Sequence, residues 1–288
     1  MKILSVKHTR ILLWLARYKY LCTEQIHLHL FPNNTVRAVQ HALEYLDKHG
    51  YIKRAKLPKS KNLNFGYLSY LTKQGLELVQ NEQQSDNYKY IKYTVTKPFS
   101  SINHYYHRYQ LINFWIKLEA DLRQLPMLEL KTILTESGQK KIGKKSLIET
   151  KLIMDKLSII PDMIFILKNI KTQKEALYMV EIDTGKEAIG GQFNTIPKGS
   201  LLYKYKIYEK FLQSLSWQKQ LETTAQTFQV LTVTERKTHL ETLMKRIQEN
   251  MTYPDHFLGS THESIKQANV FTGVTWFKSN SLMIDSLL

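Results

Sequence analysis

The chain has 288 residues, of which 43% are hydrophobic, so it is long and apolar enough to build one or two globular cores. Its formal net charge is +16, and a polyanion is the usual partner of so basic a surface. No apolar run approaches the ~20 residues of a membrane helix, and we expect neither a secretory leader nor a membrane partner. The single cysteine, Cys22, excludes an intramolecular disulfide framework and a cysteine-rich zinc site and indicates a cytoplasmic protein.

The positive charge is concentrated in the first part of the chain. Residues 1–80 contain thirteen Lys and Arg against four Asp and Glu, an excess of nine in little over a quarter of the length. Lysine-rich composition without function is the alternative, but it would not explain this uneven distribution. The distribution favours a nucleic-acid-binding segment at residues 1–80.

The first eighty residues are predicted to form a winged helix-turn-helix domain. Apolar positions at helical spacing predict a helix over residues 5–18, and Thr23 can cap a second helix that begins at Glu24. A third helix is expected over residues 34–49, with an apolar stripe toward its neighbours and a polar opposite face. The expected stripe consists of Val36, Val39, Leu43 and Leu46. Side chains near the start of a recognition helix reach base edges in the major groove, and the candidates are Asn34, Thr35, Arg37, Gln40 and His41.

A basic β-hairpin is predicted after this helix. Strand-like residues at 51–52 and 67–71 enclose a polar excursion, and a short helix follows over residues 72–79. The residues expected to contact phosphates from this wing are Lys53, Arg54, Lys56, Lys59 and Lys61. A solvated hairpin tip is the alternative. We expect domain boundaries of 1–80 for the winged helix, 81–100 for a linker and 101–288 for a second domain.

The second domain is predicted to be a mixed α/β domain. Helices are expected over residues 101–125, 201–215 and 236–247, and strands over residues 127–134, 159–167, 176–182, 228–233 and 270–277. A basic loop at residues 137–146 is expected as an insert between the first two strands. The fold class is therefore α+β, or mixed α/β, for the whole chain.

Three acids interrupt two apolar strands of this domain. Asp162 follows Pro161 at the start of one strand, and Glu181 and Asp183 end the other, where side chains two apart share a face. Buried carboxylates are costly unless they are paired or bound to metal. Together the three would form a hard oxygen cluster suited to Mg²⁺ or Mn²⁺. A structural arrangement that caps the turn at Thr184 and Gly185 is the alternative.

The chain resembles the replication-relaxation family, proteins of plasmids and mobile elements. The resemblance is carried by four features in order: His104, Pro161-Asp162, the run from Val180 through Glu187, and Lys204-Tyr205. It implies a winged helix joined to a restriction-endonuclease-like domain. In such nucleases an acid is followed by acid-x-lysine, whereas this chain has Asp183 at the lysine position.

The resemblance implies a catalytic set of Asp162, Glu181, Asp183, Lys204 and His104. Lys204 lies at the spacing of a buried helical stripe, so it could replace the missing lysine and stabilise charge on a phosphate. A structural ion pair with the acids is the alternative for Lys204, and a packing residue is the alternative for His104. Glu119, on the same predicted helix, is a candidate additional acid.

The leading functional hypothesis is a sequence-specific DNA-binding protein acting in replication or mobilisation, with double-stranded DNA, replication or mobilisation proteins and a second copy of the chain as partners. The first alternative is a Mg²⁺-dependent nickase that uses Asp162, Glu181, Asp183 and Lys204, and only this alternative requires Mg²⁺ or Mn²⁺. The second alternative is a winged-helix transcriptional repressor.

Overall fold

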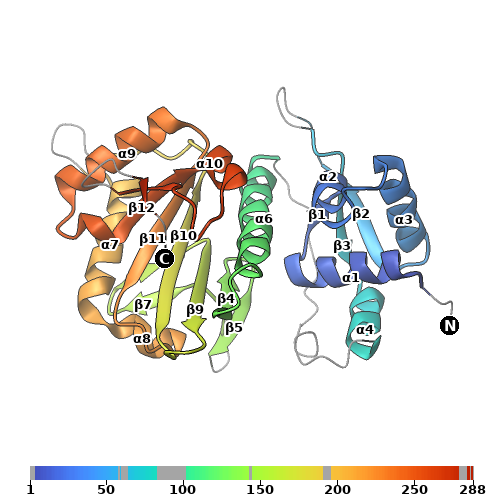
Figure 1. Ribbon diagram of the computed structural model, residues 1–288, viewed down its shortest axis with the longest axis horizontal. Coiled ribbons are helices and arrows are strands. Elements are labelled where there is room, and N and C mark those ends of the chain that lie inside the picture. Colours follow the sequence, from blue (N-terminus) through green and yellow to red (C-terminus); the bar gives the residue numbers. More distant parts are fainter. Residues whose placement is uncertain are drawn as a thin grey trace. The chain divides into compact units, whose positions relative to one another are not determined.

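The computed structural model describes residues 4–57, 59, 64–82, 102–142, 145–190, 196–278, 284–285 and 287. The chain divides into two compact units, Met1–Asn113 and Phe114–Leu288 (Figure 1). The division falls within helix α6 (Ile102–Leu122). The predicted boundaries at residues 80 and 101 stay a prediction.

The first unit combines short helices with a small antiparallel sheet. In chain order its elements before α6 are α1 (Val6–Tyr18), β1 (Leu21–Cys22), α2 (Thr23–Gln25), η1 (Ile26–Leu30), α3 (Val36–Lys48), β2 (Ile52–Lys56), β3 (Tyr67–Leu71) and α4 (Lys73–Glu82). The sheet order is β1-β3-β2, and β2 and β3 form an antiparallel hairpin. These bounds confirm that helices and hairpin strands lie where they were predicted between residues 5 and 79. The predicted cap of the second helix is wrong, because Thr23 is its first residue and Cys22 is at the cap position.

Side-chain caps fix where the two main helices of this unit begin. The Ser5 hydroxyl accepts a hydrogen bond from the backbone N–H of His8 at α1, and the Thr35 hydroxyl accepts one from Ala38 at α3. After α3, Gly50 has a φ of 77°, a left-handed conformation that glycine adopts without strain and that lets the chain turn toward β2.

The core of the first unit confirms most of the predicted apolar stripe of α3. Val39, Leu43 and Leu46 are fully buried, but 46% of Val36 is exposed. The prediction that Val36 faces inward is therefore wrong. Val36 is the first residue of α3, directly after the cap, where the helix has not yet reached its neighbours.

The second unit is built on one mixed sheet of seven strands. Its order is β14-β13-β12-β11-β10-β9-β4. The strands are β4 (Leu128–Thr135), β9 (Met163–Asn169), β10 (Glu175–Asp183), β11 (Phe228–Thr234), β12 (Phe257–Thr261), β13 (Trp276–Lys278) and β14 (Ile284–Asp285). The β10, β11 and β12 strands are parallel, whereas β9 runs antiparallel to β10. The α+β class with a mixed sheet is confirmed.

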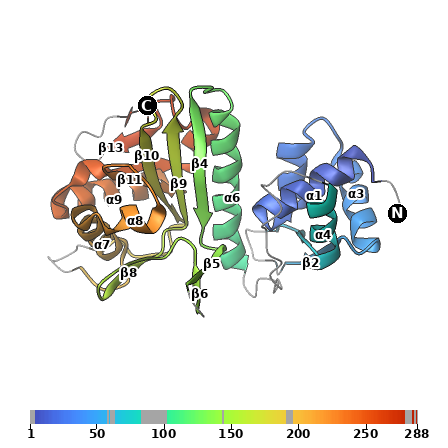
Figure 2. The ribbon, with the colours of Figure 1, turned by 90° about the horizontal axis from the view of Figure 1, so that it is seen from below.

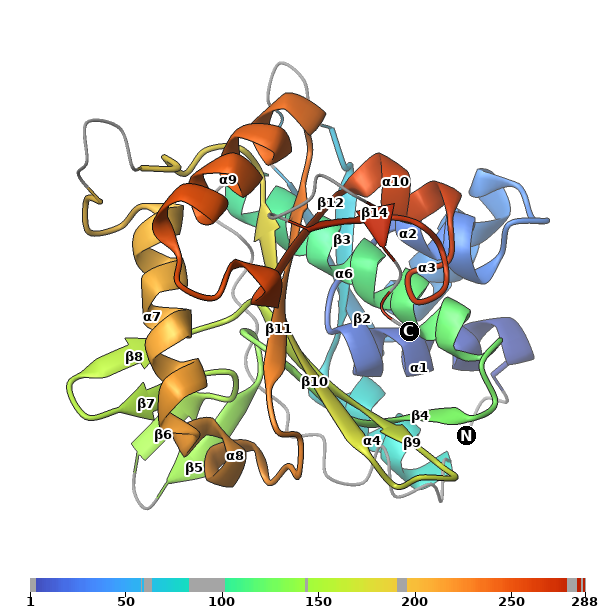
Figure 3. The same ribbon diagram turned by 60° about the vertical axis from the view of Figure 1, so that its left-hand side comes forward.

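Helices cover both faces of this sheet. Figure 2 shows α7 (Leu201–Ser214) and α9 (Lys237–Asn250) on one face and α6 on the other, and Figure 3 shows α7 and α9 beside each other. The unit also contains α8 (Ser216–Leu221), η3 (Pro254–His256) and α10 (His262–Gln267). Since β10 is an interior strand with β9 and β11 on its two sides, its last seven residues are all buried. An acid in that stretch therefore needs a partner.

Parts of the predicted strand pattern of the second unit are wrong. The expected loop at 137–146 contains most of the hairpin of β5 (Gln139–Ile142) and β6 (Lys145–Ile148), and a second hairpin follows, β7 (Leu152–Met154) and β8 (Leu157–Ile159). The strand expected at 159–167 begins only at Met163, because Pro161 and Asp162 separate it from β8.

The strand expected over residues 270–277 is reduced to β13. Asn269 accepts hydrogen bonds from the backbone N–H groups of Phe271 and Thr272, so its side chain imposes a turn there. Strand β12 was not predicted because Gly259, Ser260 and Thr261 lack strand-like apolar character. A Cβ at Gly259 would lie 2.4 Å from Leu240 Cδ1, which shows why helix α9 can approach β12 so closely.

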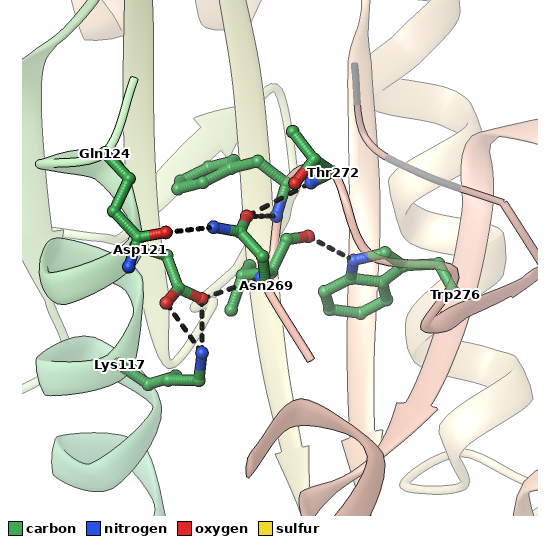
Figure 4. A network of polar contacts seen from close by, with 8 residues as sticks. Lys117, Asp121, Gln124, Asn269, Thr272 and Trp276 are labelled. Atoms are coloured by element: carbon green, nitrogen blue, oxygen red, sulfur yellow. Dashed lines mark hydrogen bonds and ion pairs between the residues drawn. The ribbon is translucent and has the colours of Figure 1, made fainter. Parts of the chain in front are cut away.

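A polar network joins α6 to the turn that follows Asn269 (Figure 4). Asp121 accepts hydrogen bonds from Lys117 Nζ and from the backbone N–H of Val270, at 2.6 and 2.7 Å. The indole of Trp276 donates to the carbonyl of Val270 at 2.8 Å. The second half of α6 thus fixes the connection that leads into β13.

Among the residues that the structure describes, no helix combines the length and apolar character needed to cross a bilayer.

Candidate functional site

The three predicted acids lie where β9 begins and β10 ends. The carboxylate of Asp162 accepts a hydrogen bond from the backbone N–H of Ile182 at 2.7 Å, and the N–H of Asp162 donates to the carbonyl of Val180 at 3.1 Å. Asp162 therefore bonds to the β10 backbone on either side of Glu181. All three acids are buried.

Glu181 is held by two side chains of α7. Lys204 Nζ forms an ion pair with Glu181 Oε2, and the Tyr208 hydroxyl donates a hydrogen bond to Oε1. The Glu181 side chain is 4% exposed and that of Lys204 is 27% exposed. Lys204 and Tyr208 are four residues apart on one helix, so they occupy the same face. This ion pair is the contact that the structural alternative for Lys204 requires, and the predicted catalytic role of Lys204 stays a prediction.

Burial and charge act against each other on this group. Burial raises the pKa of Glu181 to about 7, although the positive charge of Lys204 opposes the shift. Burial lowers the pKa of Lys204, but the charges of Glu181 and Asp162 outweigh it and leave the pKa above its ordinary value. Burial, and then the Glu181 charge, raise the pKa of Tyr208 well above its ordinary value. The lysine thus stays charged, and protonation of Glu181 is possible near neutral pH.

Asp183 is engaged by a different helix. His239 Nε2 of α9 lies 2.5 Å from Asp183 Oδ2, and the backbone N–H of Gly185 donates to Oδ1 at 2.7 Å. Gly185 has a φ of 72°, and its hydrogen bond to Asp183 closes the turn at Thr184 and Gly185. This is the capping arrangement that the sequence analysis gave as the structural alternative to metal binding.

Three residues that the sequence analysis did not assign to the acidic site also lie there. Tyr208 and His239 bind the acids of β10, and carboxylate oxygens of Glu136 and Asp162 lie within 4.8 Å of each other. Tyr208 could have been found from its place four residues after Lys204. Glu136 and His239 carried no sequence signal, because only the sheet brings these distant segments together.

The donor atoms of this site suit a hard divalent cation by type, but most of them already have partners. Each carboxylate oxygen of Glu181 and Asp183 contacts an N–H, ammonium, hydroxyl or imidazole group, and one oxygen of Asp162 accepts from Ile182. A cation at Glu181 would compete with Lys204. As it stands, the cluster is a hydrogen-bonded polar network rather than an open cage of oxygens.

The two predicted residues of α6 have different environments. His104 is exposed near the start of the helix. Glu119 is buried and accepts a hydrogen bond from the indole of Trp115 on its own helix. Their predicted roles in catalysis stay predictions.

The second candidate site is the polar face of α3. Arg37, Gln40 and His41 are exposed there. The Arg37 guanidinium donates to His41 at 3.4 Å, and His41 lies 3.4 Å from Glu44. Thr35 caps the helix, and the carbonyl of Asn34 contacts His27 Nε2 at 2.8 Å, so these two residues help to set the start of α3.

The β2–β3 hairpin adds exposed lysines beside this helix. Lys53, Lys56 and Lys59 are exposed, and Lys61 lies outside the described residues. Arg54 differs from them, because its side chain is only 11% exposed and its guanidinium lies 4.7 Å from the ring of Tyr67 and 3.8 Å from Glu44. Arg54 thus links the hairpin to α3, whereas the lysines are available to an external anion.

Comparison with known proteins places the chain in one family. The sequence model of the replication-relaxation family matches residues 12–246, which include most of α1, all of α3 and the acidic site. No curated protein and no solved structure is significantly similar to the chain. On the extent of this match, the chain belongs to the replication-relaxation family.

Proposed function

We propose that the chain is a sequence-specific DNA-binding protein of a plasmid or other mobile element that acts in its replication or mobilisation. Membership of the replication-relaxation family indicates a role in replication or relaxation of such an element. The observation that carries the proposal is the exposed polar face of α3 beside the exposed lysines of β2, in a segment with nine excess positive charges.

The helix α3 has the two properties that a recognition helix requires. Its buried residues Val39, Leu43 and Leu46 fix it to the rest of the unit, and Arg37 and Gln40 are exposed in its first two turns. Helices of winged helix-turn-helix proteins use such N-terminal residues to contact base edges. This supports a winged helix that docks α3 in a major groove.

The lysines of the hairpin would bind DNA phosphates and would not distinguish one base sequence from another. The exposed ammonium groups of Lys53, Lys56 and Lys59 lie on or directly after β2, within seven residues. Lysines of this kind bind phosphates and position the protein on the duplex. A hairpin beside the recognition helix would serve as the wing.

The acidic site of the second unit supports binding rather than cutting. Lys204 and His239 already contact the two acids of β10, so the network stabilises the end of that strand without a ligand. We infer that the second unit is a restriction-endonuclease-like scaffold whose acids have a structural role.

Duplex-binding titrations test this function. Purified protein is titrated against a duplex from the replication origin of its parent replicon and against an unrelated duplex of equal length and composition. We expect tighter binding to the origin duplex, a preference that Arg37→Ala reduces and that Arg123→Ala, an exposed arginine of the second unit, leaves unchanged. Equal binding to both duplexes would contradict sequence-specific recognition.

A metal-dependent nickase is the second candidate, and two observations favour it. Lys204 contacts Glu181, as expected of a lysine that has moved to the helix after the acid pair, and Glu136 places a further carboxylate near Asp162. In this role Asp162, Glu181 and Asp183 would hold Mg²⁺, and Lys204 would stabilise charge on the phosphate.

Nicking of supercoiled DNA separates the two candidates. Parent-replicon DNA is incubated with protein and Mg²⁺, Mn²⁺ or EDTA, beside the variant Glu181→Ala, Asp183→Ala and a control with two exposed acids changed, Glu235→Ala, Glu241→Ala. We expect binding without relaxed circles. Relaxed circles that require metal, persist in the control and vanish in the first variant would establish the nickase.

A further inference from the structure

Val36 is an exposed apolar residue at the start of α3, a helix whose other apolar residues lie on its buried side. It is 46% exposed, whereas Val39, one turn further, is fully buried. Gln40 lies four residues after Val36 and is also exposed, so the two side chains share one face of α3. Single exposed apolar residues are common. The residues around Val36 and Gln40 therefore have to show whether this pair binds a ligand.

Val36 and Gln40 face the same hollow of about 360 Å³. The hollow is open to solvent and is lined by residues of α2 and η1 and by residues of the hairpin, among them Arg54 and Tyr67. Val36 is thus open toward a space between the proposed recognition helix and the wing. A group of the size of a base edge can enter that space.

The charge around the hollow favours a base edge over a phosphate. Glu24 is one of the lining residues, and its carboxylate would repel a phosphate group. The guanidinium of Arg54 lies 4.7 Å from the ring of Tyr67 and 3.8 Å from the Glu44 carboxylate, which offsets its charge, and its Nε can still donate a hydrogen bond. Arg37 donates a hydrogen bond to His41 and does not line the hollow. The side chains of α3 that line it are therefore the branched apolar group of Val36 and the amide of Gln40.

This pair of side chains matches the major-groove edge of an A·T base pair. Adenine presents N7 as an acceptor and N6 as a donor, a pattern that a glutamine amide binds with two hydrogen bonds. Thymine presents its C5 methyl group, which contacts apolar side chains. Neither feature occurs on the major-groove edge of a G·C pair.

We propose that Val36 and Gln40 read A·T base pairs, Val36 by packing on a thymine methyl group and Gln40 by hydrogen bonding to adenine N6 and N7. This inference rests on the proposed DNA binding of α3. It adds Val36 to the residues proposed to contact bases, and it specifies that Val36 and Gln40 prefer A·T over G·C base pairs.

Selection from random duplexes and methyl deletion test this proposal. Full-length protein selects duplexes from a random pool, and each thymine of the selected site is then replaced by deoxyuridine, which lacks only the methyl group. For the wild type, one replacement should lower affinity about fourfold, the value of one buried methyl-sized group. Gln40→Ala should lower affinity for the selected site by about fivefold or more and relax the preference for adenine at one position.

Two variants make the comparison specific. Val36→Ala removes two methyl groups from the proposed contact and should reduce the difference between the thymine and deoxyuridine sites. Val6→Ala should keep the wild-type difference, because Val6 is likewise exposed and is likewise the first residue of a capped helix, α1. A selected site whose affinity depends on no thymine methyl group, or a methyl effect of undiminished size in Val36→Ala, would overturn the assignment. If the wild type selects no duplex, the proposed function fails as well.

Discussion

A buried glutamate, a lysine and a tyrosine form a hydrogen-bonded group in the second unit. Glu181 lies near the end of the interior strand β10 with almost no exposure, and Lys204 of α7 forms an ion pair with it. Removing one partner of a buried ion pair leaves the other charge without compensation, and this costs more than the pair itself contributes. The energetic role of Lys204 can therefore be measured directly.

We expect Lys204→Met to lower the free energy of unfolding at pH 8 by about 2–3 kcal/mol, because Glu181 then keeps only Tyr208 as a partner. Urea unfolding of the variant and the wild type measures the difference. Lys210→Met removes an exposed lysine from the same helix and should stay within about 0.5 kcal/mol of the wild type. Equal losses in the two variants would show that Lys204 has no special partner.

The raised pKa of Glu181 predicts a pH dependence. Its pKa is about 7 in the native protein, above the ordinary value of 4.5, so the native state favours the protonated acid. The stability contribution is complete below pH 4.5 and is lost as the pH rises through 7, by about 3 kcal/mol in total. Glutamine does not ionise, so Glu181→Gln should not lose stability in this way. The free energy of unfolding of the variant minus that of the wild type should therefore increase between pH 4.5 and 8. Parallel pH profiles of the two proteins in urea unfolding would contradict the assignment.

The sequence predicted part of the acidic site, for physical reasons. Helical spacing placed Lys204 on the buried stripe of α7, and alternation along β10 placed Glu181 and Asp183 on one face. The partners from other segments, His239 and Glu136, depend on which strands become neighbours, and local patterns do not contain that information. The error at Val36 has a local cause, since a residue at a helix start can continue the apolar spacing without reaching the core.

At the scale of elements, caps and close contacts decide where helices and strands lie. Thr35 accepts a hydrogen bond from Ala38 at the start of α3, and a helix without its cap is destabilised by about 1 kcal/mol. Thr35 was predicted to contact DNA, so its capping role offers a separate explanation for any loss of function on mutation.

We expect Thr35→Ala to lower the free energy of unfolding of the protein by about 1 kcal/mol, with a matching loss in thermal stability. Thr35→Ser keeps the hydroxyl and should unfold like the wild type. The contrast is measured by thermal and urea unfolding without DNA. If Thr35→Ala unfolds like the wild type, the hydroxyl does not stabilise α3.

The elements that could be predicted are those with strong local periodicity. Helices α1, α3, α7 and α9 and strands β4, β10 and β11 agree closely with the expected ranges. Strand β12 was missed because Gly259 lies under Leu240 of α9, a tertiary reason for a glycine that weakens the strand pattern. The expected strand before Trp276 was wrong because the Asn269 side chain forms a turn with the following backbone.

At the scale of the whole molecule, the basic charge and the acidic network belong to different units. The first eighty residues hold an excess of nine positive charges, whereas Glu181 and Asp183 of the second unit are buried and contact Lys204 and His239. This distribution supports the proposals that the first unit contacts DNA through α3 and the hairpin and that the buried acids of the second unit have a structural role.

The salt dependence of DNA affinity tests this assignment most directly. Duplex affinity is measured from low to moderate salt for the wild type, for Lys53→Ala, Lys56→Ala, Lys59→Ala combined, and for Lys171→Ala, Lys174→Ala, Lys219→Ala combined, a control that removes the same charge from exposed positions of the second unit. We expect the hairpin variant to flatten the slope of log affinity against log salt by up to ~0.9 for each phosphate that no longer has a lysine partner, with the control slope unchanged. Equal slopes for all three proteins, or a change in the control alone, would contradict DNA binding through the hairpin.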